Sequence, residues 1–338
     1  MARLRRSRSV GLIVACAVAA AGCLADLGER SDLVIGFHIQ GGTETERELA
    51  LEHGAATTNH GISWNVLEPS PNDYDFRFAD AAAQWAGEHD LHVTAMHFAW
   101  DQALLDDVPD WVLDIDDATE LRGVLERRAA TIFGRYPDID RIVVVNEPLD
   151  VLGPSLYANH FFNVLGPDYI AELFGIVSAA APSSTELILN ENLIEYSQPK
   201  ADALVALVSD LVEHGAAIDG VGLQSHLLLG EPDWRRYRTT MEQIAALDLD
   251  IHVTEFDAPV EPALPDRLNV QAQRYHEAVS ACLAVTRCRS FTFWGVTDAH
   301  TWIDDFIGPG LDPLLFDADG SGKPAFLSVV RALGAGRP

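Results

Sequence analysis

The sequence predicts an α/β protein folded as a (β/α)8 TIM barrel. Apolar runs of strand length alternate along the chain with helical stretches of about ten to eighteen residues, which is typical of a parallel sheet. Eight such repeats occur without a Gly-x-Gly-x-x-Gly turn, so a closed barrel is favoured over an open dinucleotide-binding sheet. Polar side chains stand at or just beyond the ends of the runs, where this fold builds its active sites.

Each predicted strand is a short run of apolar and β-branched residues. In chain order the strands are Leu33–Phe37, Ala55–Thr58, His92–Met96, Ile142–Val145, Glu186–Leu189, Gly220–Leu223, Ile251–Val253 and Phe291–Trp294. Amphipathic patterns with helical periodicity lie between and after them. These predict helices at Thr43–His53, Phe78–His89, Thr119–Tyr136, Asp168–Ala181, Pro199–His214, Asp233–Leu247, Val270–Val285 and Ala325–Leu333.

The chain divides into an export signal, a short tether and one domain. Four arginines and an apolar run fill residues 1–22, a pattern typical of a signal peptide and too short for a stable membrane span. Residues 23–32 are expected to be a short tether. No interior segment has the composition of a linker, so residues 33–338 are expected to form a single catalytic domain.

Cys23 is the candidate for lipidation. It directly follows Ala20-Ala21-Gly22, which resembles the lipobox of bacterial lipoproteins, although Ala20 stands where that motif usually has Leu. Secretion after cleavage at a small residue is the alternative, and the Arg5-Arg6 pair also permits a twin-arginine route. The protein is therefore expected to be exported, either secreted or lipid-anchored at the cell surface.

The charge of the chain excludes several partners. The net charge is −28, and removal of residues 1–22 takes four arginines and no acids, which leaves 19 minus 51, or −32. So acidic a surface repels nucleic acid and anionic lipid, and it favours a neutral substrate over a phosphorylated one. Contact with a membrane is expected only through a lipid at Cys23, and the protein is expected to be a monomer.

Cys282 and Cys288 are predicted to form a disulfide. Two cysteines six positions apart in an exported protein are typically bridged, and neither Cys-x-x-Cys nor clustered His accompanies them to suggest a metal. The acidic pairs Asp304-Asp305 and Asp317-Ala-Asp319 lack the spacing of a calcium loop, so solvated loops are the better interpretation. No cofactor and no metal is expected.

Glu147 and Glu255 form the candidate catalytic pair. Each ends a β-branched run, in Ile142-Val-Val-Val-Asn-Glu-Pro148 and in Ile251-His-Val-Thr-Glu-Phe-Asp257. Either glutamate alone is most simply an exposed charge at a strand end. Together they follow strands four and seven, which face each other across a barrel, as the two carboxyls of a glycosidase must face each other across the sugar.

Neighbouring polar residues support this pair. Asn146 could hydrogen-bond a sugar 2-hydroxyl, an interaction that strengthens in the transition state. His226, beyond strand six, could keep Glu255 ionised by donating a hydrogen bond, although an isolated histidine is more often structural.

Four tryptophans follow strand ends and are candidate sugar platforms. An indole ring offers a flat face to the C–H groups of a sugar, whereas a buried tryptophan packs equally well as core. Their clustering after strands two, three and eight favours a binding cleft. The four are Trp64, Trp100, Trp294 and Trp302.

Four motifs in register resemble glycoside hydrolase family 10, the (β/α)8 endo-β-1,4-xylanases. They are Val144-Val-Asn-Glu147, Gly222-Leu-Gln-Ser-His226, Val253-Thr-Glu-Phe-Asp257 and Phe293-Trp-Gly-Val-Thr-Asp298 followed by Trp302. Supporting matches are Leu67-Glu-Pro-Ser70, Asn163-Val-Leu-Gly-Pro-Asp-Tyr-Ile170 and Ala281-Cys-Leu-Ala-Val-Thr-Arg-Cys288, where many family members carry a disulfide. The resemblance covers essentially the whole chain after the signal.

The resemblance implies a retaining double displacement. Glu147 is similar to the acid/base of the family and Glu255 to its nucleophile. Asn146, Gln224 and His226 resemble the residues that bind the sugar at the cleavage point and orient the nucleophile. Trp294 and Trp302 resemble the indoles that close over that sugar.

The chain departs from the family where the glycone sugars are bound. After strand two, the family's Glu, Asn and Lys are replaced by Asn59, His60 and Ser63. After strand three, Met96 stands where the sugar-binding His is usual, and Ile142-Val143 replaces a Trp-Asp pair. Loss of hydrogen bonds to substrate hydroxyls strongly changes discrimination between substrates.

Three functions are therefore weighed. The first is a retaining endo-β-1,4-xylanase that hydrolyses xylan or a related β-linked plant polysaccharide. The second is the same chemistry on a different β-glycan or glycoside. The third is a non-hydrolytic surface glycan-binding protein, which is disfavoured because binding alone needs no proton donor.

Overall fold

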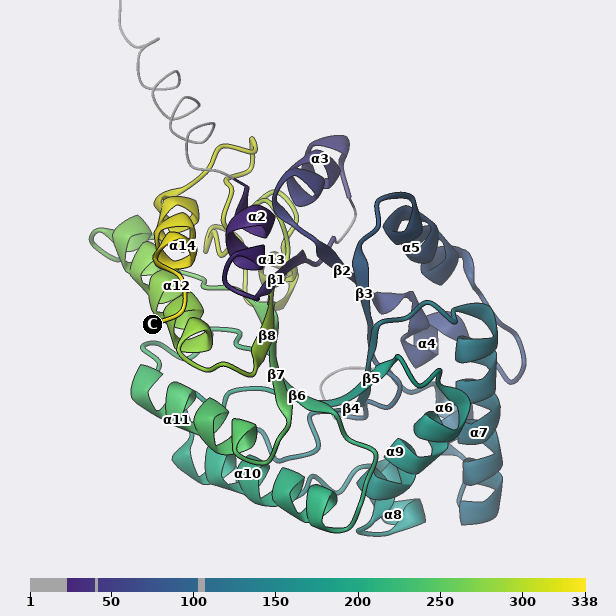
Figure 1. Ribbon diagram of the computed structural model, residues 1–338. Coiled ribbons are helices and arrows are strands. Elements are labelled where there is room, and N and C mark those ends of the chain that lie inside the picture. The colour runs from purple at the N-terminus through teal and green to yellow at the C-terminus, as the bar shows by residue number, and fades with distance from the viewer. Residues whose placement is uncertain (1–22, 40–41, 103–106) are drawn as a thin grey trace, which may run out of the picture.

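The computed structural model describes residues 23–39, 42–102 and 107–338. Eight parallel strands pair in chain order into a closed barrel, with β1 paired to both β2 and β8, and the helices form an outer ring (Figure 1). The predicted (β/α)8 fold is confirmed. The strands are β1 Val34–Phe37, β2 Ala56–Asn59, β3 His92–Ala95, β4 Arg141–Asn146, β5 Glu186–Glu191, β6 Gly220–Leu223, β7 Asp250–Phe256 and β8 Cys288–Phe293.

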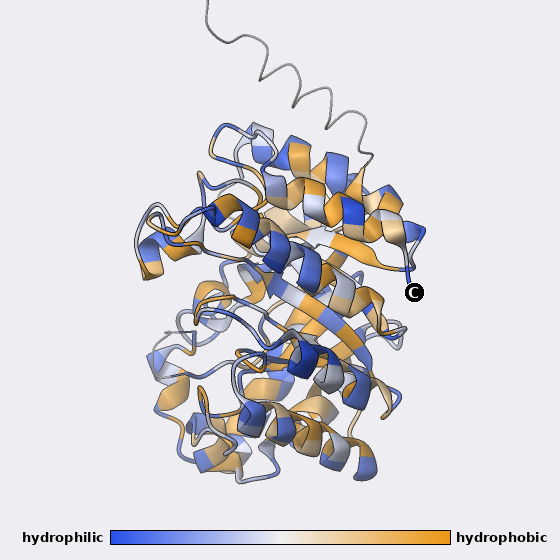
Figure 2. Cartoon of the chain, turned by 90° about the vertical axis from the view of Figure 1, so that its left-hand side faces the viewer, coloured by the Kyte–Doolittle hydropathy of each residue, from blue (hydrophilic) through white to orange (hydrophobic). Residues whose placement is uncertain are grey.

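Each strand is followed by a helix at the position that the sequence pattern predicts. These helices are α3 Glu44–His53, α5 Arg77–Glu88, α7 Ala118–Arg135, α9 Tyr169–Ala180, α10 Gln198–Glu213, α11 Trp234–Ala245, α12 Arg267–Leu283 and α14 Pro324–Ala335. Side-chain caps start several of them: Thr43 forms a capping box with Glu46, and Asp117 and Ser197 accept hydrogen bonds from helix N–H groups. Hydrophobic and hydrophilic residues alternate around these helices (Figure 2), because one side of each helix packs on the barrel.

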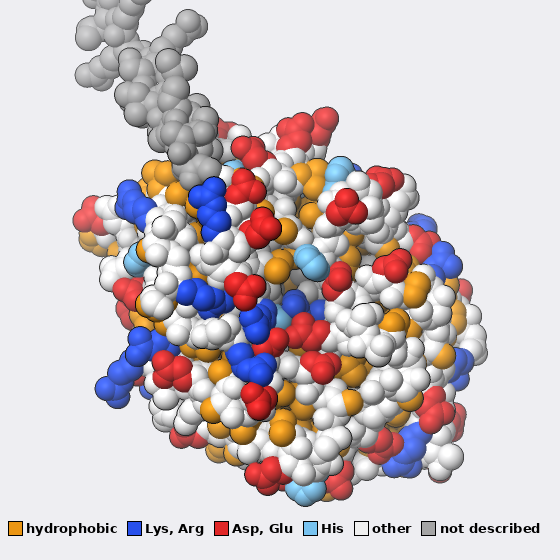
Figure 3. Space-filling model, in the orientation of Figure 1, with side chains coloured by type: hydrophobic (Ala, Val, Ile, Leu, Met, Phe, Trp, Pro, Cys, Tyr) orange, Lys and Arg blue, Asp and Glu red, His pale blue; other side chains and the backbone are white. Residues whose placement is uncertain are grey.

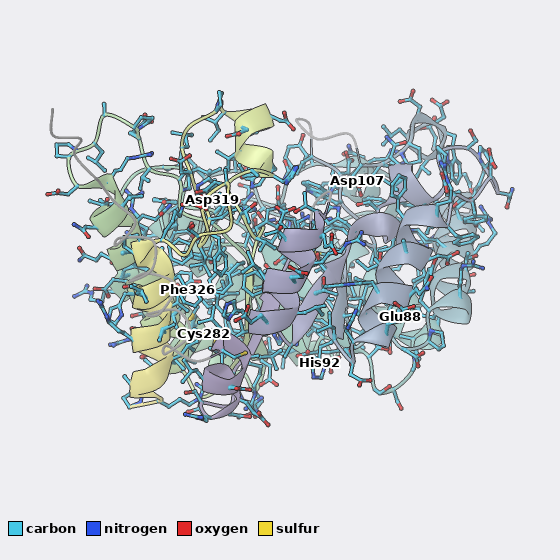
Figure 4. All side chains as sticks on the ribbon, turned by 90° about the horizontal axis from the view of Figure 1, so that it is seen from above. Glu88, His92, Asp107, Cys282, Asp319 and Phe326 are labelled. Atoms are coloured by element: carbon cyan, nitrogen blue, oxygen red, sulfur yellow. A yellow bond between two sulfur atoms is a disulfide. The ribbon has the colours of Figure 1, made fainter. Side chains whose placement is uncertain are left out.

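Short helices in the loops were not predicted, because one or two turns leave no clear periodicity. They are α2 Leu24–Glu29, the 3-10 helix η1 His60–Ile62, α4 Trp64–Leu67, α6 Asp110–Leu113, α8 His160–Leu165 and α13 Trp302–Phe306. All but α2 follow a strand and thus build the rim at which the strands end. In Figure 4, Asp107 in the loop after β3 lies at the opposite edge from His92, where β3 begins.

The predicted tether at residues 23–32 is wrong over most of its length. Leu24–Glu29 form α2, in which Leu24 is fully buried, and α2 packs against α14. Gly28 permits this contact, since a Cβ there would lie 2.5 Å from the carbonyl oxygen of Leu33. The segment therefore belongs to the barrel. The predicted signal, residues 1–22, lies outside the described residues.

A polar cluster joins four strands near the end of the barrel at which the strands begin. Arg141 Nε contacts Glu186 Oε2 at 2.7 Å, and His252 Nε2 lies 2.8 Å from Glu186 Oε1. His252 Nδ1 in turn contacts the Ser290 hydroxyl at 2.9 Å. We call Arg141, Glu186, His252 and Ser290 the floor cluster, because they lie in the first halves of β4, β5, β7 and β8.

The disulfide between Cys282 at the end of α12 and Cys288 at the start of β8 is present, as predicted. Acidic and basic side chains are interspersed over the face of the molecule in Figure 3, which gives no single basic patch there. Among the described residues, none of the helices has the length and hydropathy needed to cross a bilayer.

Candidate active site

A cavity of about 620 Å³ opens at the ends of the strands and contains both predicted catalytic glutamates. Seven of the predicted substrate-binding residues also line it. They are Asn146, Gln224, His226, His60, Trp100, Trp294 and Trp302. Residues that are far apart in sequence meet here because the carboxyl ends of all eight parallel strands converge at one end of the barrel.

Glu147 is held in a sharp turn directly after β4. The Glu147 backbone has φ of 51°, and its N–H donates to the carbonyl of Asn190. The side-chain amide of Gln102 donates to the backbone carbonyl of Glu147. The Gln224 amide donates to Glu147 Oε1 at 2.7 Å. Burial and the nearby charge of Glu255 raise the pKa of Glu147, although the bond from Gln224 opposes them. The carboxyl is thus suited to carry a proton.

Glu255, within β7, has the opposite electrostatic environment. Asn190 donates to its Oε1 at 2.7 Å, and His226 Nε2 lies 3.2 Å from its Oε2. His97 Nε2 stands 4.0 Å from Oε1. Burial alone would raise the pKa of Glu255, but the bond from His226 and the charges of His226 and His97 outweigh it and hold that pKa well below its usual range. Glu255 is therefore ionised and suited to attack.

His226 owes its charge to a second carboxylate. Its Nδ1 contacts Asp257 Oδ2 at 2.9 Å, and Trp302 Nε1 donates to the same oxygen at 2.7 Å. Burial lowers the pKa of His226, yet the charge of Asp257 and the bonds to Asp257 and Glu255 raise it to about 10. The protonated imidazole thus donates to both carboxylates, and Trp302 is fixed over the cavity by the same chain of contacts.

Asn190 is the central residue that sequence reasoning missed. Its amide N–H₂ group donates to Glu255 Oε1 and, at 2.8 Å, to Asn146 Oδ1, while Thr254 donates to its Oδ1. Gly222 makes room for it, since a Cβ there would lie 2.2 Å from Asn190 Oδ1. Position at the end of β5 was the available signal, but many polar residues share it.

A histidine after β3 lies close to Glu255. The sequence places Met96 where a sugar-binding His is usual, and Met96 is buried against Val143, Ile188 and Trp294. The next residue, His97, lines the cavity instead. The cavity wall after β3 therefore carries a histidine, one residue later than the position of Met96.

Two predicted substrate-binding residues are wrong. Trp64 is fully buried outside the cavity, where the Arg128 guanidinium lies 4.6 Å from its ring, so it is core. Asn59 is also buried: its amide donates to the carbonyl of Ala79 and accepts from the N–H of Gly61, which starts η1. Asn59 turns away from the cavity where η1 packs on α5, whereas Trp64 packs against Arg128, Trp111 and Phe161.

Several polar atoms in the cavity wall have no hydrogen-bond partner within the described part of the chain. They are His60 Nε2, both ring nitrogens of His97 and Trp100 Nε1. The rings pack edge to face or tilted, with centroids 5.1 Å apart for His60 and His97 and 4.8 Å for His97 and Trp100. Buried polar groups are normally satisfied, so these atoms are suited to a hydroxyl-rich ligand.

Residues 23–39, 42–102 and 107–338 contain no group of three or more His, Cys, Asp or Glu arranged to hold a metal ion. Asp317 instead accepts hydrogen bonds from the backbone of Asp319 and Ser321 within its own turn. Cys23 is partly buried, and its thiol donates to the carbonyl of Glu52 at 2.6 Å.

Known proteins share both the sequence and this architecture. The chain is 31% identical over 288 residues to endo-1,4-beta-xylanase 1 of Humicola insolens, covering 83% of this chain and 66% of that protein. It is 30% identical to endo-1,4-beta-xylanase B of the same organism, covering 84% and 79% of the two chains.

Among solved structures, native xylanase 10B from Thermotoga maritima superposes with a TM-score of 0.85 and 26% identity, over 93% of this chain and 98% of that one. Xylanase 10B from Thermotoga petrophila in complex with xylobiose gives the same TM-score and identity, over 93% and 97%. The family model of glycosyl hydrolase family 10 matches residues 26–332, and the chain belongs to that family.

Proposed function

We propose that this protein is a retaining endo-1,4-β-xylanase that hydrolyses xylan or a related β-linked plant polysaccharide. The observation that carries the proposal is the pair of glutamates in one cavity, one with its pKa raised and the other held ionised. Retaining glycosidases need this division between acid and nucleophile. The similarity to xylanases, one of them in complex with xylobiose, supports xylan as the substrate.

In the first step, Glu255 attacks the anomeric carbon while Glu147 protonates the departing glycosidic oxygen. The C–O bond to the leaving chain breaks as the glycosyl ester with Glu255 forms. In the second step, Glu147, now a carboxylate, takes a proton from water as that water attacks the same carbon. Glu255 leaves as a carboxylate, and the anomeric configuration is retained.

The surrounding residues bind and orient the sugar. Asn146, Gln224 and His226 lie around the two glutamates, and Trp294 and Trp302 supply indole surfaces beside them. His60 and Trp100 offer free polar atoms in the wall formed by the loops after β2 and β3. This assignment of substrate contacts is part of the proposal.

A second substrate is favoured by one observation. Asn59 is turned inward and Met96 is buried in the core, so neither replaces the sugar contacts expected at these positions. The same retaining chemistry on another β-glycan is therefore the alternative.

The test is hydrolysis of a panel of β-linked polysaccharides with sizing of the products, by the wild-type protein and by Glu255→Gln. The proposal expects xylo-oligosaccharides of several lengths from wild type and none from the variant. Release from another glycan alone would overturn the substrate. Binding without turnover by both proteins would instead indicate a glycan-binding protein.

We further propose that the protein is exported as a monomer, either secreted or anchored by a lipid at Cys23. Fractionation of cells that express wild type or Cys23→Ala tests this point. Lipidation predicts that the wild type is in the membrane fraction and the variant is released. Equal release of the wild type and the variant into the medium would indicate ordinary secretion without a lipid.

A further inference from the structure

Three exposed apolar side chains stand at the mouth of the catalytic cavity. Among the described residues, the loops after β2, β4 and β8 place Phe78, Val151 and Phe306 in the cavity lining with 62%, 49% and 53% of their surfaces exposed. Large exposed apolar patches are rare on soluble proteins and commonly mark a binding surface. Their position on the substrate cavity links them to the substrate.

Four apolar residues from neighbouring loops line one side of this mouth. Ile39 follows β1, Phe78 and Ala82 belong to α5 after β2, and Phe306 ends α13 after β8; all four line the cavity. Since β8, β1 and β2 are neighbours in the barrel, their loops are adjacent. We call these four residues the apolar wall.

The backbone that carries Phe78 is packed closely against the loop after β2. A Cβ at Gly61 would lie 2.3 Å from the backbone nitrogen of Ala79, so only glycine lets the start of α5 approach the loop after β2 this closely. Ala82 lies one turn after Phe78 on the same face of the helix. The wall is thus a preformed feature of the fold.

The cavity offers little to a charged substituent in this region. Among the described residues that line it, the ionisable side chains are Glu147, Glu255 and histidines, with neither Lys nor Arg. Beside the wall, the Arg77 guanidinium lies 5.8 Å from the Phe78 ring, but it is already paired with Asp75 at 2.5 Å, so an acidic sugar branch would compete with that carboxylate. Ile39, Phe78 and Ala82 offer a sugar hydroxyl no hydrogen-bond partner, whereas an apolar group placed on them would remove apolar surface from water.

We propose that the apolar wall binds an aromatic acyl group esterified to the xylan chain, which makes the enzyme selective for acylated xylan. The inference rests on the proposed function. An aromatic ring fits because Phe78 and Phe306 offer aromatic faces and edges, and ring pairs add to the free energy of apolar burial. No charge or hydroxyl of the substituent needs a partner on Ile39 or Ala82.

The test compares two xylo-oligosaccharides of equal length, one plain and one carrying a single feruloyl ester, by their kcat/KM values. The wild type should favour the acylated substrate. Phe78→Ala should lower the ratio of the two values roughly tenfold, the scale of a lost apolar contact in a binding site. The matched control is Leu268→Ala on α12, an exposed apolar side chain outside the cavity, which should leave the ratio unchanged.

A ratio of one or less for wild type, or the same ratio for wild type and Phe78→Ala, overturns the inference. Hydrolysis of neither substrate by wild type means that the proposed function has failed. In that case, calorimetric binding of the same two oligosaccharides to wild type and Phe78→Ala decides the inference separately. Tighter binding of the acylated one, lost in the variant, upholds it, and equal binding overturns it.

Discussion

Glu147 and Glu255 line one cavity, yet their pKa values move in opposite directions. Burial pushes both upward. The difference lies in the hydrogen-bond donors: a neutral amide, Gln224, contacts Glu147, whereas the charged imidazole of His226 contacts Glu255. Two residues of the same type thus acquire different chemistry from the groups that surround them.

Glu147→Gln should lower kcat on xylan by about 10²–10⁴, the usual contribution of general acid catalysis. For an aryl xyloside, whose phenol leaving group needs no protonation, the same variant should lower the rate of the first step much less. Steady-state and burst kinetics on both substrates measure this split. Equal losses on both substrates would contradict the role of Glu147 as the acid, and Glu88→Gln, an exposed change on α5, serves as the control.

His226→Asn should move the acid side of the pH profile of kcat/KM upward. Glu255 must be ionised to attack, and without the imidazolium its pKa rises, so activity falls first at low pH. The pKa of about 10 for His226 keeps this residue charged throughout the neutral range. His214→Asn on the exposed end of α10 is the control. A profile that only drops in height, with no shift, would show that His226 has no electrostatic role.

At the scale of elements, the loop after β4 depends on a buried ion pair. Lys200, near the start of α10, places its Nζ 2.9 Å from Glu191 Oε1 at the end of β5. The other Glu191 oxygen accepts from the N–H of Leu149, two residues after Glu147. Burial raises the pKa of Glu191 to about 7, and Lys200 opposes that rise. The pair thus connects α10 and β5 to the turn that contains Glu147.

Above pH 7, where Glu191 is ionised in the wild type, Lys200→Met should destabilise the protein by roughly 3–5 kcal/mol, because the carboxylate would remain buried without its cation. Denaturant unfolding of wild type and variant gives the free energy. The double variant Lys200→Met/Glu191→Gln should recover part of the loss, since no buried charge then remains. A single variant as stable as wild type would show that Glu191 is already neutral in the folded protein.

At the scale of the whole molecule, the floor cluster joins strands on different sides of the barrel. Burial raises the pKa of Glu186, but the charge and hydrogen bond of His252 and the contact with Arg141 lower it to about 2. Glu186 therefore ionises more readily in the folded state than at its ordinary value of 4.5. Its contribution to stability is fully present above about pH 4.5 and is lost as the pH falls through about 2.

This contribution is roughly 3 kcal/mol if the unfolded chain has the ordinary value. The free energy of unfolding should therefore fall between pH 5 and pH 2 in wild type and fall less in Glu186→Gln, which is less stable at neutral pH. Urea unfolding at a series of pH values measures both curves. If the free energy of unfolding fell equally with pH in the two proteins, Glu186 would not contribute to the loss of stability in acid.

The repeats of the chain were enough to predict the barrel, because strand and helix periods are local properties that each segment carries by itself. The same holds for the two glutamates, whose positions at strand ends place them at the catalytic end of any such barrel. Trp64 and Asn59 show where that reasoning stops. They follow a strand like the true lining residues, but η1 and α4 turn them into the interior.

The sequence by itself determined the fold class, the eight strands, the disulfide, the two glutamates and seven of the nine predicted substrate-binding residues that line the cavity. Only the tertiary structure decided which neighbours surround each carboxyl: Asn190 joins Glu255 to Asn146, and His97 lies 4.0 Å from Glu255. It also decided that α2 is part of the barrel. The physical reason is distance. Periodicity depends on near neighbours in the chain, whereas hydrogen bonds, burial and the resulting pKa values depend on residues that only folding brings together.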